Sequence, residues 1–377
     1  MKRQRWFLSL VFIFSQGLFS KSLESYITNI PASLMSNKIM IATYNLENLF
    51  DTIHDKNKKD WTYLPLKDKI KDRNHVTRCL TQPQAYMHSC FYKDWNNDSL
   101  TKKLTNMGKV IKEMNQGLGP DILVLQEVEN MNVLSMLVEK ELQGLGYDYI
   151  SLLEGADARG IDVAILSKYE IMAEKIYPHS FLKEKEGEMK RQNSRPILEA
   201  VIKVQNKTIV VLANHWPSQA NPSVARVAAA EMMRDIALGH VDNVDLVVAT
   251  GDFNTINRDN PHPYKGNGFS DTFVDAEAVA RLLKSDLNEG THWYRGTWSS
   301  LDKIFIASKS LEKKKLITNW QSFDIFKRSF MVKNFNYKDR DTGISTHHEG
   351  VPKRFSSRTG DGYSDHLPVT LNFHLAE

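Results

Sequence analysis

Short apolar runs rich in β-branched residues recur along this chain and limit what it can fold into. Eight runs have the length of a strand, at residues 38–45, 121–125, 163–166, 197–204, 208–213, 245–250, 301–307 and 367–375. Three segments with helical spacing begin at Leu100, Met131 and Val224 and end near Gly117, Leu142 and Gly239. This alternation predicts one α/β domain in which two sheets pack together with helices outside.

Two stretches lack a sustained pattern. Residues 51–98 are charged and aromatic, and 55–95 are predicted to be a surface insertion in a single domain spanning 38–377. Residues 308–358 are mainly polar and are predicted to be rich in loops. The insertion holds both cysteines, Cys79 and Cys90, and in an exported protein a local disulfide between them would be worth about 3 kcal/mol.

The first 22 residues have the pattern of a secretory signal. A basic start at Lys2–Arg5 precedes the apolar stretch 6–14, and small residues at Ser20 and Ser22 fit a cleavage site. We therefore expect export, to the periplasm or the medium. The alternative is an uncleaved anchor, although the apolar run is shorter than the roughly 20 residues that span a bilayer. Because this start carries three basic residues and the whole chain has a net charge of only +4, net charge does not indicate a nucleic-acid partner.

Polar side chains suited to catalysis lie at or beside the ends of the predicted strands. They are Asn45, Glu127, Asn214, His215, Asp252, Asn254, Asp302, Asp365 and His366. If these strand ends converge, they form a rim of carboxylates, amides and two imidazoles. Oxygen-rich ligands suit Mg²⁺ or Mn²⁺, and two histidines without a suitable cysteine argue only moderately against Zn²⁺.

Each of these residues has an ordinary structural explanation when it is taken alone. Asn45 would suit a turn at a strand end, Glu127 the first turn of a helix, and Asp302 a salt bridge with Lys303. The pair Asp365-His366 would fit a polar loop before a strand. Six coincidences beside six strands are less probable than one shared site, so the pattern predicts a metal-dependent active site.

Six ordered motifs resemble the endonuclease/exonuclease/phosphatase superfamily, which has the deoxyribonuclease I-like fold. They are Tyr44-Asn45-Leu46-Glu47-Asn48-Leu49-Phe50-Asp51, Leu125-Gln126-Glu127, Ala213-Asn214-His215-Trp216-Pro217-Ser218, Gly251-Asp252-Phe253-Asn254, Leu301-Asp302-Lys303-Ile304 and Tyr363-Ser364-Asp365-His366-Leu367-Pro368-Val369. The resemblance covers about residues 38–375 and is closest to the exported bacterial and mycoplasmal membrane nucleases. It implies a four-layered α/β/β/α sandwich of two mixed sheets, with the site between them.

The resemblance also implies metal-dependent hydrolysis of a phosphoric ester. Glu127 matches the family's main metal ligand, Asn45 lies beside it, and Asp365 matches a carboxylate close to the metal or the attacking water. The implied ion is Mg²⁺ or Mn²⁺, with Ca²⁺ as a candidate additional ion.

The same comparison assigns the acid–base residues. Asp252 matches the carboxylate that orients or deprotonates the attacking water, and Asn254 matches the amide that contacts the phosphate. His366 matches the imidazole near the phosphate, which Asp302 holds. His215 matches the second imidazole of the nuclease branch.

Residues beside the motifs are further candidates. Arg195 and Arg354 are predicted to contact the substrate phosphate, with Arg358 as an alternative to Arg354 and a plain surface role as the other interpretation. Asp162 is a candidate for orienting His215, and equally a solvated acid at a strand entry.

Together these inferences predict an exported nuclease, an endonuclease in the first instance, that acts on DNA and potentially RNA. It is expected to act as a monomer without an obligate protein partner. One alternative keeps the site but changes the substrate to a phospholipid or inositol-phosphate head group. Another, from a different class, is an inactive binding or toxin-like module, against which the presence of every expected polar residue argues.

Overall fold

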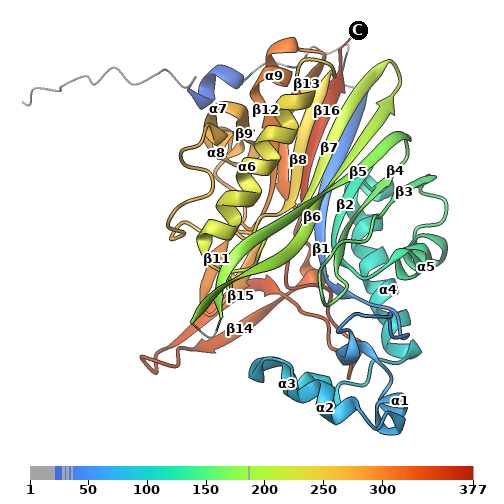
Figure 1. The fold of residues 1–377 in the computed structure, drawn as a ribbon. Helices are drawn as coiled ribbons and strands as arrows, with labels where there is room; N and C mark the ends of the chain where they lie inside the picture. The colour runs from blue at the N-terminus through green and yellow to red at the C-terminus, as the bar shows by residue number, and fades with distance from the viewer. Residues whose placement is uncertain (1–21, 28–29, 31–33, 35–36, 186, 377) are drawn as a thin grey trace, which may run out of the picture.

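A computed structural model describes residues 22–27, 30, 34, 37–185 and 187–376. The signal predicted for residues 1–22 lies outside this part, apart from Ser22. The described chain forms two six-stranded mixed sheets packed face to face with helices on both outer sides, as the resemblance implied (Figure 1). Within these ranges no helix has the length and apolar character needed to cross a membrane.

The first sheet places the two ends of the domain side by side. In order across the sheet, its strands are β13 (Leu316–Ile325), β16 (Val369–Leu375), β1 (Lys38–Leu49), β2 (Ile122–Val128), β4 (Asp162–Ser167) and β3 (Tyr149–Ser151). Only β1 and β2 run parallel. Their register becomes irregular after Asn45, so the chain beyond this residue turns away from the ladder.

The second sheet has the same general plan. Its strands are β5 (Glu170–Lys185), β6 (Glu188–Val204), β7 (Lys207–His215), β8 (Leu246–Asp252), β12 (Asp302–Ala307) and β9 (Phe273–Asp275). The parallel pair β7 and β8 brings His215 opposite Asp252, and antiparallel β12 brings Asp302 opposite the same residue. Register alone therefore gathers three predicted site residues at one edge of this sheet.

Alternating side chains explain why the central strands are covered on both faces. In β8, Leu246 and Val248 belong to the large core that includes the inter-sheet layer, whereas Val247 and Ala249 pack in the core beneath α6 (Ser223–His240). Successive side chains of a strand point to opposite faces, so a strand without polar alternation must be buried on both sides. The uninterrupted apolar run at 245–250 reflects this position.

The remaining helices cover the sheets from outside. They are α4 (Asn97–Glu113), α5 (Met131–Glu141), α7 (Phe269–Thr272), α8 (Ala276–Leu283) and α9 (Ser308–Lys313), with short 3₁₀ turns at Leu23–Tyr26, Trp61–Tyr63, Met114–Gly117 and Ser329–Met331. Figure 1 shows α4 and α5 outside the first sheet and α6 outside the second. The helix expected to end at Gly239 continues to His240, and α4 is capped by Asn96, whose side chain accepts from the amide of Ser99.

The expectation of loops at 308–358 is wrong. This stretch contains α9, the edge strand β13 and a ribbon formed by β14 (Val332–Lys338) and β15 (Ser345–Pro352), beside the smaller ribbon β10 (His292–Tyr294) and β11 (Thr297–Ser299). An edge strand buries only alternate residues, and the two-stranded β14–β15 ribbon is largely exposed. Because of their polar composition, these strands have no apolar pattern in the sequence that would predict them. The same is true of the long hairpin formed by β5 and the first half of β6.

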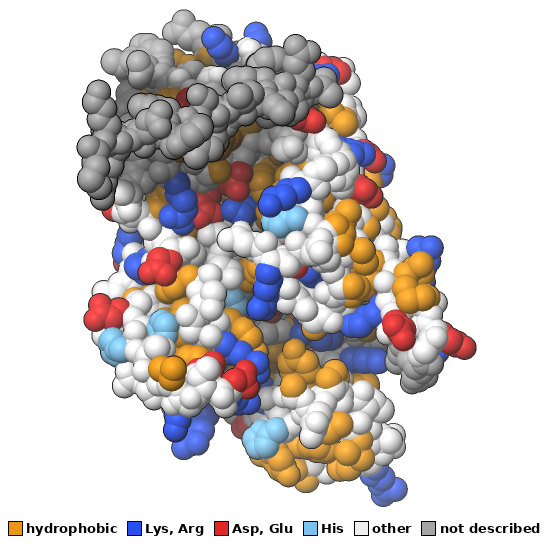
Figure 2. Space-filling view, turned by 90° about the vertical axis from the view of Figure 1, so that its left-hand side faces the viewer, with side chains coloured by type: hydrophobic (Ala, Val, Ile, Leu, Met, Phe, Trp, Pro, Cys, Tyr) orange, Lys and Arg blue, Asp and Glu red, His pale blue; other side chains and the backbone are white. Residues whose placement is uncertain are grey.

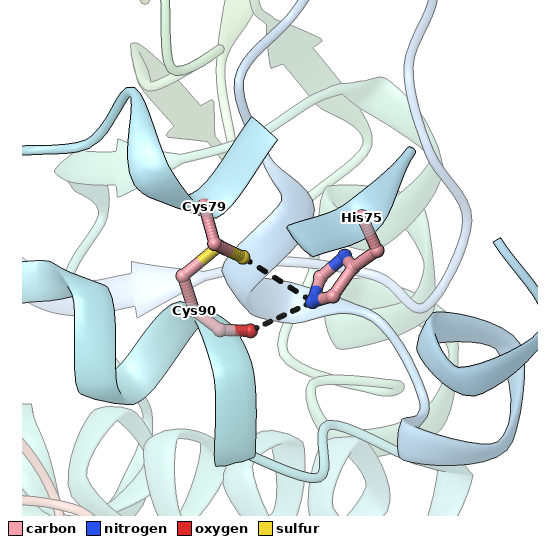
Figure 3. A group of neighbouring side chains, drawn as sticks. All are labelled: His75, Cys79 and Cys90. Atoms are coloured by element: carbon pink, nitrogen blue, oxygen red, sulfur yellow. Dashed lines mark hydrogen bonds between the residues drawn. A yellow bond between two sulfur atoms is a disulfide. The ribbon is translucent and has the colours of Figure 1, made fainter. Parts of the chain in front are cut away.

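The insertion is helical. It contains α1 (Leu66–Lys71), α2 (His75–Leu80) and α3 (Gln84–Tyr92), and a disulfide joins Cys79 to Cys90, which confirms the expected pairing. Nε2 of His75 lies 3.1 Å from the carbonyl oxygen of Cys90 and 3.3 Å from Sγ of Cys79 (Figure 3). The helices are too short for a recognisable period, so cross-linking and buried polar contacts hold them together.

Candidate active site

His366 and Asp302 form a buried carboxylate–imidazole pair. Nδ1 of His366 lies 2.7 Å from Oδ2 of Asp302, whose side chain is fully buried. Burial alone would lower the pKa of His366, but the charge and hydrogen bond of Asp302 outweigh burial and hold this pKa well above its ordinary value. The ring is therefore an imidazolium at neutral pH, and its Nε2 lies 3.9 Å from Oδ2 of Asp252.

Asp252 lies at the centre of the site. Its Oδ1 accepts a 2.8 Å hydrogen bond from the amide of Asn254, and its Oδ2 accepts a 3.1 Å bond from Nδ2 of Asn45. Burial raises the pKa of Asp252 and the nearby charge of His366 lowers it again, which leaves the pKa at about 7. A carboxylate of this pKa can take a proton from water near neutral pH.

His215 provides a second, uncharged imidazole. Its Nε2 lies 3.8 Å from Oε1 of Glu127 and 3.7 Å from Oδ2 of Asp252. Burial lowers the pKa of His215, and the positive charges of Arg195 and Arg159 lower it further, well below the ordinary range. Unlike His366, this ring can donate or accept one hydrogen bond without carrying charge.

Two residues predicted to assist at the site have other partners. Oδ1 of Asp162 accepts a 2.8 Å hydrogen bond from the amide of Gly155, while Oδ2 of Asp162 and Nδ1 of His215 both lack a partner among the described residues, so no hydrogen bond joins Asp162 to that ring. Arg195 donates from Nε to the carbonyl of His215 at 3.0 Å and from Nη2 to the carbonyl of Trp216 at 2.6 Å. Its guanidinium thus holds the chain that follows β7.

Glu127 and Asn254 share an unusual backbone conformation. Their φ angles are 60° and 49°, in the left-handed region that residues other than glycine rarely adopt. Glu127 lies at a register irregularity between β2 and β4, with a partly exposed side chain, and Nδ2 of Asn254 donates to the carbonyl of Trp216 at 3.1 Å. Such conformations persist where surrounding structure enforces them, often at functional sites.

Arg354 bridges two acids at the rim of the site. Its Nε lies 2.7 Å from Oε1 of Glu47 and its Nη2 lies 3.2 Å from Oδ2 of Asp365, while 59% of its side chain is exposed. Burial raises the pKa of Asp365, but Arg354 and His366 outweigh burial and bring it below its ordinary value. Arg354 is therefore placed beside the predicted metal ligand and open to solvent, as a phosphate contact requires.

The carboxylate and amide oxygens of the site are donors of the kind that a hard divalent cation prefers. Burial raises the pKa of Glu47 and the negative charge of Asp365 raises it further, although the charge of Arg354 acts in the opposite direction. Potential ligand atoms of His292, Asp365 and His366 lie within 4.8 Å of one another, as do those of Asp252, Asp302 and His366. Glu127 belongs to neither group, and Oδ1 of Asn45 accepts a 3.0 Å hydrogen bond from the amide of Glu47.

Two site residues were not singled out from the sequence. Glu47 follows Asn45 by two positions within one motif, and this closeness to a predicted ligand was a usable signal, although the φ of 51° at Glu47 and the register shift after Asn45 mean that strand alternation does not set its direction. His292 had no such signal, since a β-bridge to His366 brings it in from a separate ribbon, with ring centroids 4.7 Å apart. Burial lowers the pKa of His292 to about 4, helped by the charge of His366, so this ring is also neutral.

Comparison with known proteins places this geometry in context. The sequence profile described as the endonuclease/exonuclease/phosphatase family matches residues 81–375. No curated protein matches the sequence. Similar solved structures include TDP2 of Caenorhabditis elegans, which is 14% identical over 93% of this chain and 78% of that chain, with a TM-score of 0.48. A protein described as an endonuclease/exonuclease/phosphatase family member, from Bacteroides thetaiotaomicron, is 14% identical over 90% of this chain and 95% of that chain, with a TM-score of 0.48. Sphingomyelinase C of Streptomyces griseocarneus is 12% identical over 89% of this chain and 99% of that chain, with a TM-score of 0.47.

Proposed function

The chain belongs to the endonuclease/exonuclease/phosphatase family, whose members hydrolyse phosphoric esters with divalent metals, and on this premise we propose that it is an exported, metal-dependent nuclease of DNA. The observation that carries the proposal is a charged imidazole beside a carboxylate with a pKa near 7. Asp302 holds His366, and Nε2 of His366 lies 3.9 Å from Asp252. Such a pair places an acid and a base side by side, within reach of a phosphate oxygen and of a water that attacks the phosphorus.

The roles follow from protonation states. Asp252 accepts a proton from the attacking water, and the imidazolium of His366 donates through Nε2 to a phosphate oxygen or to the leaving oxygen. His215, neutral and 3.7 Å from Asp252, donates a hydrogen bond to a non-bridging oxygen. Mg²⁺ or Mn²⁺ held by Asn45, Glu127 and Asp365 would supply positive charge where negative charge grows in the transition state.

Export is part of the proposal, and the disulfide supports it. Cys79 and Cys90 are both fully buried, and disulfides of this kind persist in oxidising compartments such as the periplasm or the medium. The predicted signal at residues 1–22 agrees with that setting. We propose that the enzyme acts there as a monomer on nucleic acid.

The direct test incubates the purified protein with supercoiled plasmid and with RNA, in the presence of Mg²⁺, Mn²⁺, Ca²⁺ or EDTA. We expect nicking that EDTA abolishes and that His215→Ala lowers by at least about 100-fold, in the range typical of a lost general acid–base or oxyanion contact. His347→Ala is the matched control, because His347 is an exposed histidine on β15. Inertness toward both nucleic acids would overturn the proposal.

A second candidate keeps the site and changes the ester to a phospholipid head group. The observation that favours it is the exposed apolar surface of α2 and α3, described below. Release of phosphorylated head groups from vesicles, without cleavage of DNA or RNA, would replace the first proposal with this one.

A further inference from the structure

Helix α3 is apolar yet largely unburied. Its nine residues include no charged side chain, and only Cys90 among them is buried. Tyr86 and Tyr92 are 58% and 67% exposed, and on the adjoining α2 Val76 and Leu80 are 58% and 59% exposed. We call Val76, Leu80, Tyr86 and Tyr92 the α2–α3 surface. Val76 and Leu80 are one helical turn apart and so share a face of α2, and a larger exposed apolar face of this kind is typical of a docking site.

The α2–α3 surface stands on a rigid lobe. The disulfide joins α2 to α3, and Nζ of the buried Lys69 on α1 donates to the carbonyls of Thr62, Cys90 and Lys93 at 2.9, 3.1 and 2.7 Å. Figure 2 shows hydrophobic side chains spread over the lobe at the bottom of the molecule, where Figure 1 places α2 and α3. A preformed surface binds without the entropy cost of ordering a loop.

The segment that forms the lobe has an excess of basic residues. Between Leu66 and Lys93 the chain has six basic residues and two acidic ones. Asp72 is paired with Arg78 at 2.5 Å and Lys69 is buried, which leaves Lys67, Lys71 and Arg73 exposed against one exposed acid, Asp68. Exposed aliphatic and tyrosine side chains beside lysine and arginine match the boundary between acyl chains and anionic head groups.

The lobe is anchored beside the active site. Tyr63, in the 3₁₀ turn that leads into α1, stacks on Phe50 with ring centroids 4.0 Å apart, and Nε1 of Trp95 donates to the carbonyl of Phe50 at 3.1 Å. Phe50 follows Glu47 of the site rim by three residues. The base of the lobe is therefore anchored to the chain that directly follows Asn45 and Glu47.

We propose that the α2–α3 surface docks the protein onto anionic phospholipid bilayers. Its four apolar side chains enter the head-group boundary, and Lys67, Lys71 and Arg73 face the lipid phosphates. Aliphatic Val76 and Leu80 favour lipid over a nucleic-acid strand, because bases stack on aromatic rings and gain little from branched aliphatic chains. Docking does not depend on which ester the site hydrolyses, and it can be measured in EDTA without turnover.

The test places a polarity-sensitive fluorophore on the full chain at Leu80→Cys, and in a separate protein at Leu282→Cys. Leu282 is a comparably exposed leucine on α8, which Figure 1 places far from α2 and α3. With vesicles that contain phosphatidylglycerol we expect a blue shift only at position 80, weaker at high salt and absent with phosphatidylcholine alone. This readout is local, so binding through the N-terminal segment would not imitate it.

Serine variants supply the second measurement. Leu80→Ser with Tyr92→Ser should weaken partitioning into phosphatidylglycerol vesicles by about 100-fold, since each buried apolar side chain is worth about a factor of ten. Leu282→Ser should not. No blue shift at position 80, or equal losses in both variants, would overturn the proposal. It would also fall if the double variant instead lost affinity for single-stranded DNA, or abolished a concentration-dependent dimer, with vesicle binding intact.

Discussion

Nδ2 of Asn45 donates a 3.1 Å hydrogen bond to Oδ2 of Asp252, and this bond joins the two sheets at the active site. Asn45 belongs to β1 of the first sheet, and Asp252 ends β8 of the second, 207 positions away. A residue of one sheet therefore places a hydrogen-bond donor on the base carried by the other.

The first prediction is the pH dependence of hydrolysis. Asp252 must be deprotonated to accept a proton, and its pKa is about 7, so kcat/KM should rise as pH increases through 7. Asn45→Ala removes a donor to the carboxylate and should move this limb upward by about one pH unit. The profile is measured at saturating divalent ion, because Asn45 is also a predicted ligand. If Asn45→Ala leaves the rise of kcat/KM at the same pH, Asp252 is not the group that accepts the proton.

Removing the imidazolium should cost more than removing its partner. We expect His366→Ala to lower kcat by about 10³-fold and Asp302→Asn by about 10- to 100-fold, since the ring keeps its place but loses the charge that maintains its protonation. The double variant should resemble His366→Ala, because both residues act in one step. Additive losses, or a fully active His366→Ala protein, would contradict this assignment.

Arg354 should affect substrate and metal in opposite directions. Arg354→Ala removes a positive charge from between Glu47 and Asp365, so we expect KM for DNA to rise about tenfold while a divalent ion binds more tightly. Arg354→Lys keeps the charge without the paired contacts, so its KM and its metal affinity should lie between those of the wild-type protein and Arg354→Ala. Calorimetric titration with Mn²⁺ measures the second effect without turnover. Weaker metal binding in Arg354→Ala would indicate a purely structural role.

The disulfide should stabilise the lobe without serving the chemistry. Replacing both Cys79 and Cys90 by serine should cost about 3 kcal/mol, from the loop-entropy estimate for a cross-link over 11 positions. We expect faster proteolysis within 66–93 and weaker vesicle binding, with plasmid nicking retained at low temperature. Loss of nicking in a folded double variant would show that the lobe also positions the site.

Most of the candidate site could be predicted from the sequence because its residues adjoin buried strands. Asn45, Glu127, His215, Asp252 and Asp302 each lie at a point where an apolar run meets polar side chains. Pairing of neighbouring strands is then enough to bring some of them together. His215 and Asp302 both lie opposite Asp252 in this way. Edge strands escaped prediction, because β13 and the exposed ribbons have polar side chains on the face that meets water.

The sequence by itself determined the β-rich, two-sheet plan, the pairing of its two cysteines and the identity of most polar groups at the site, since these depend on local pattern and spacing. Only the tertiary structure decided their protonation states. Equivalent imidazoles became a charged His366 and a neutral His215 because one received a buried carboxylate and the other received arginines as neighbours. The positions of His292 and Arg354 were likewise decided by contacts between distant segments, which a linear pattern does not encode.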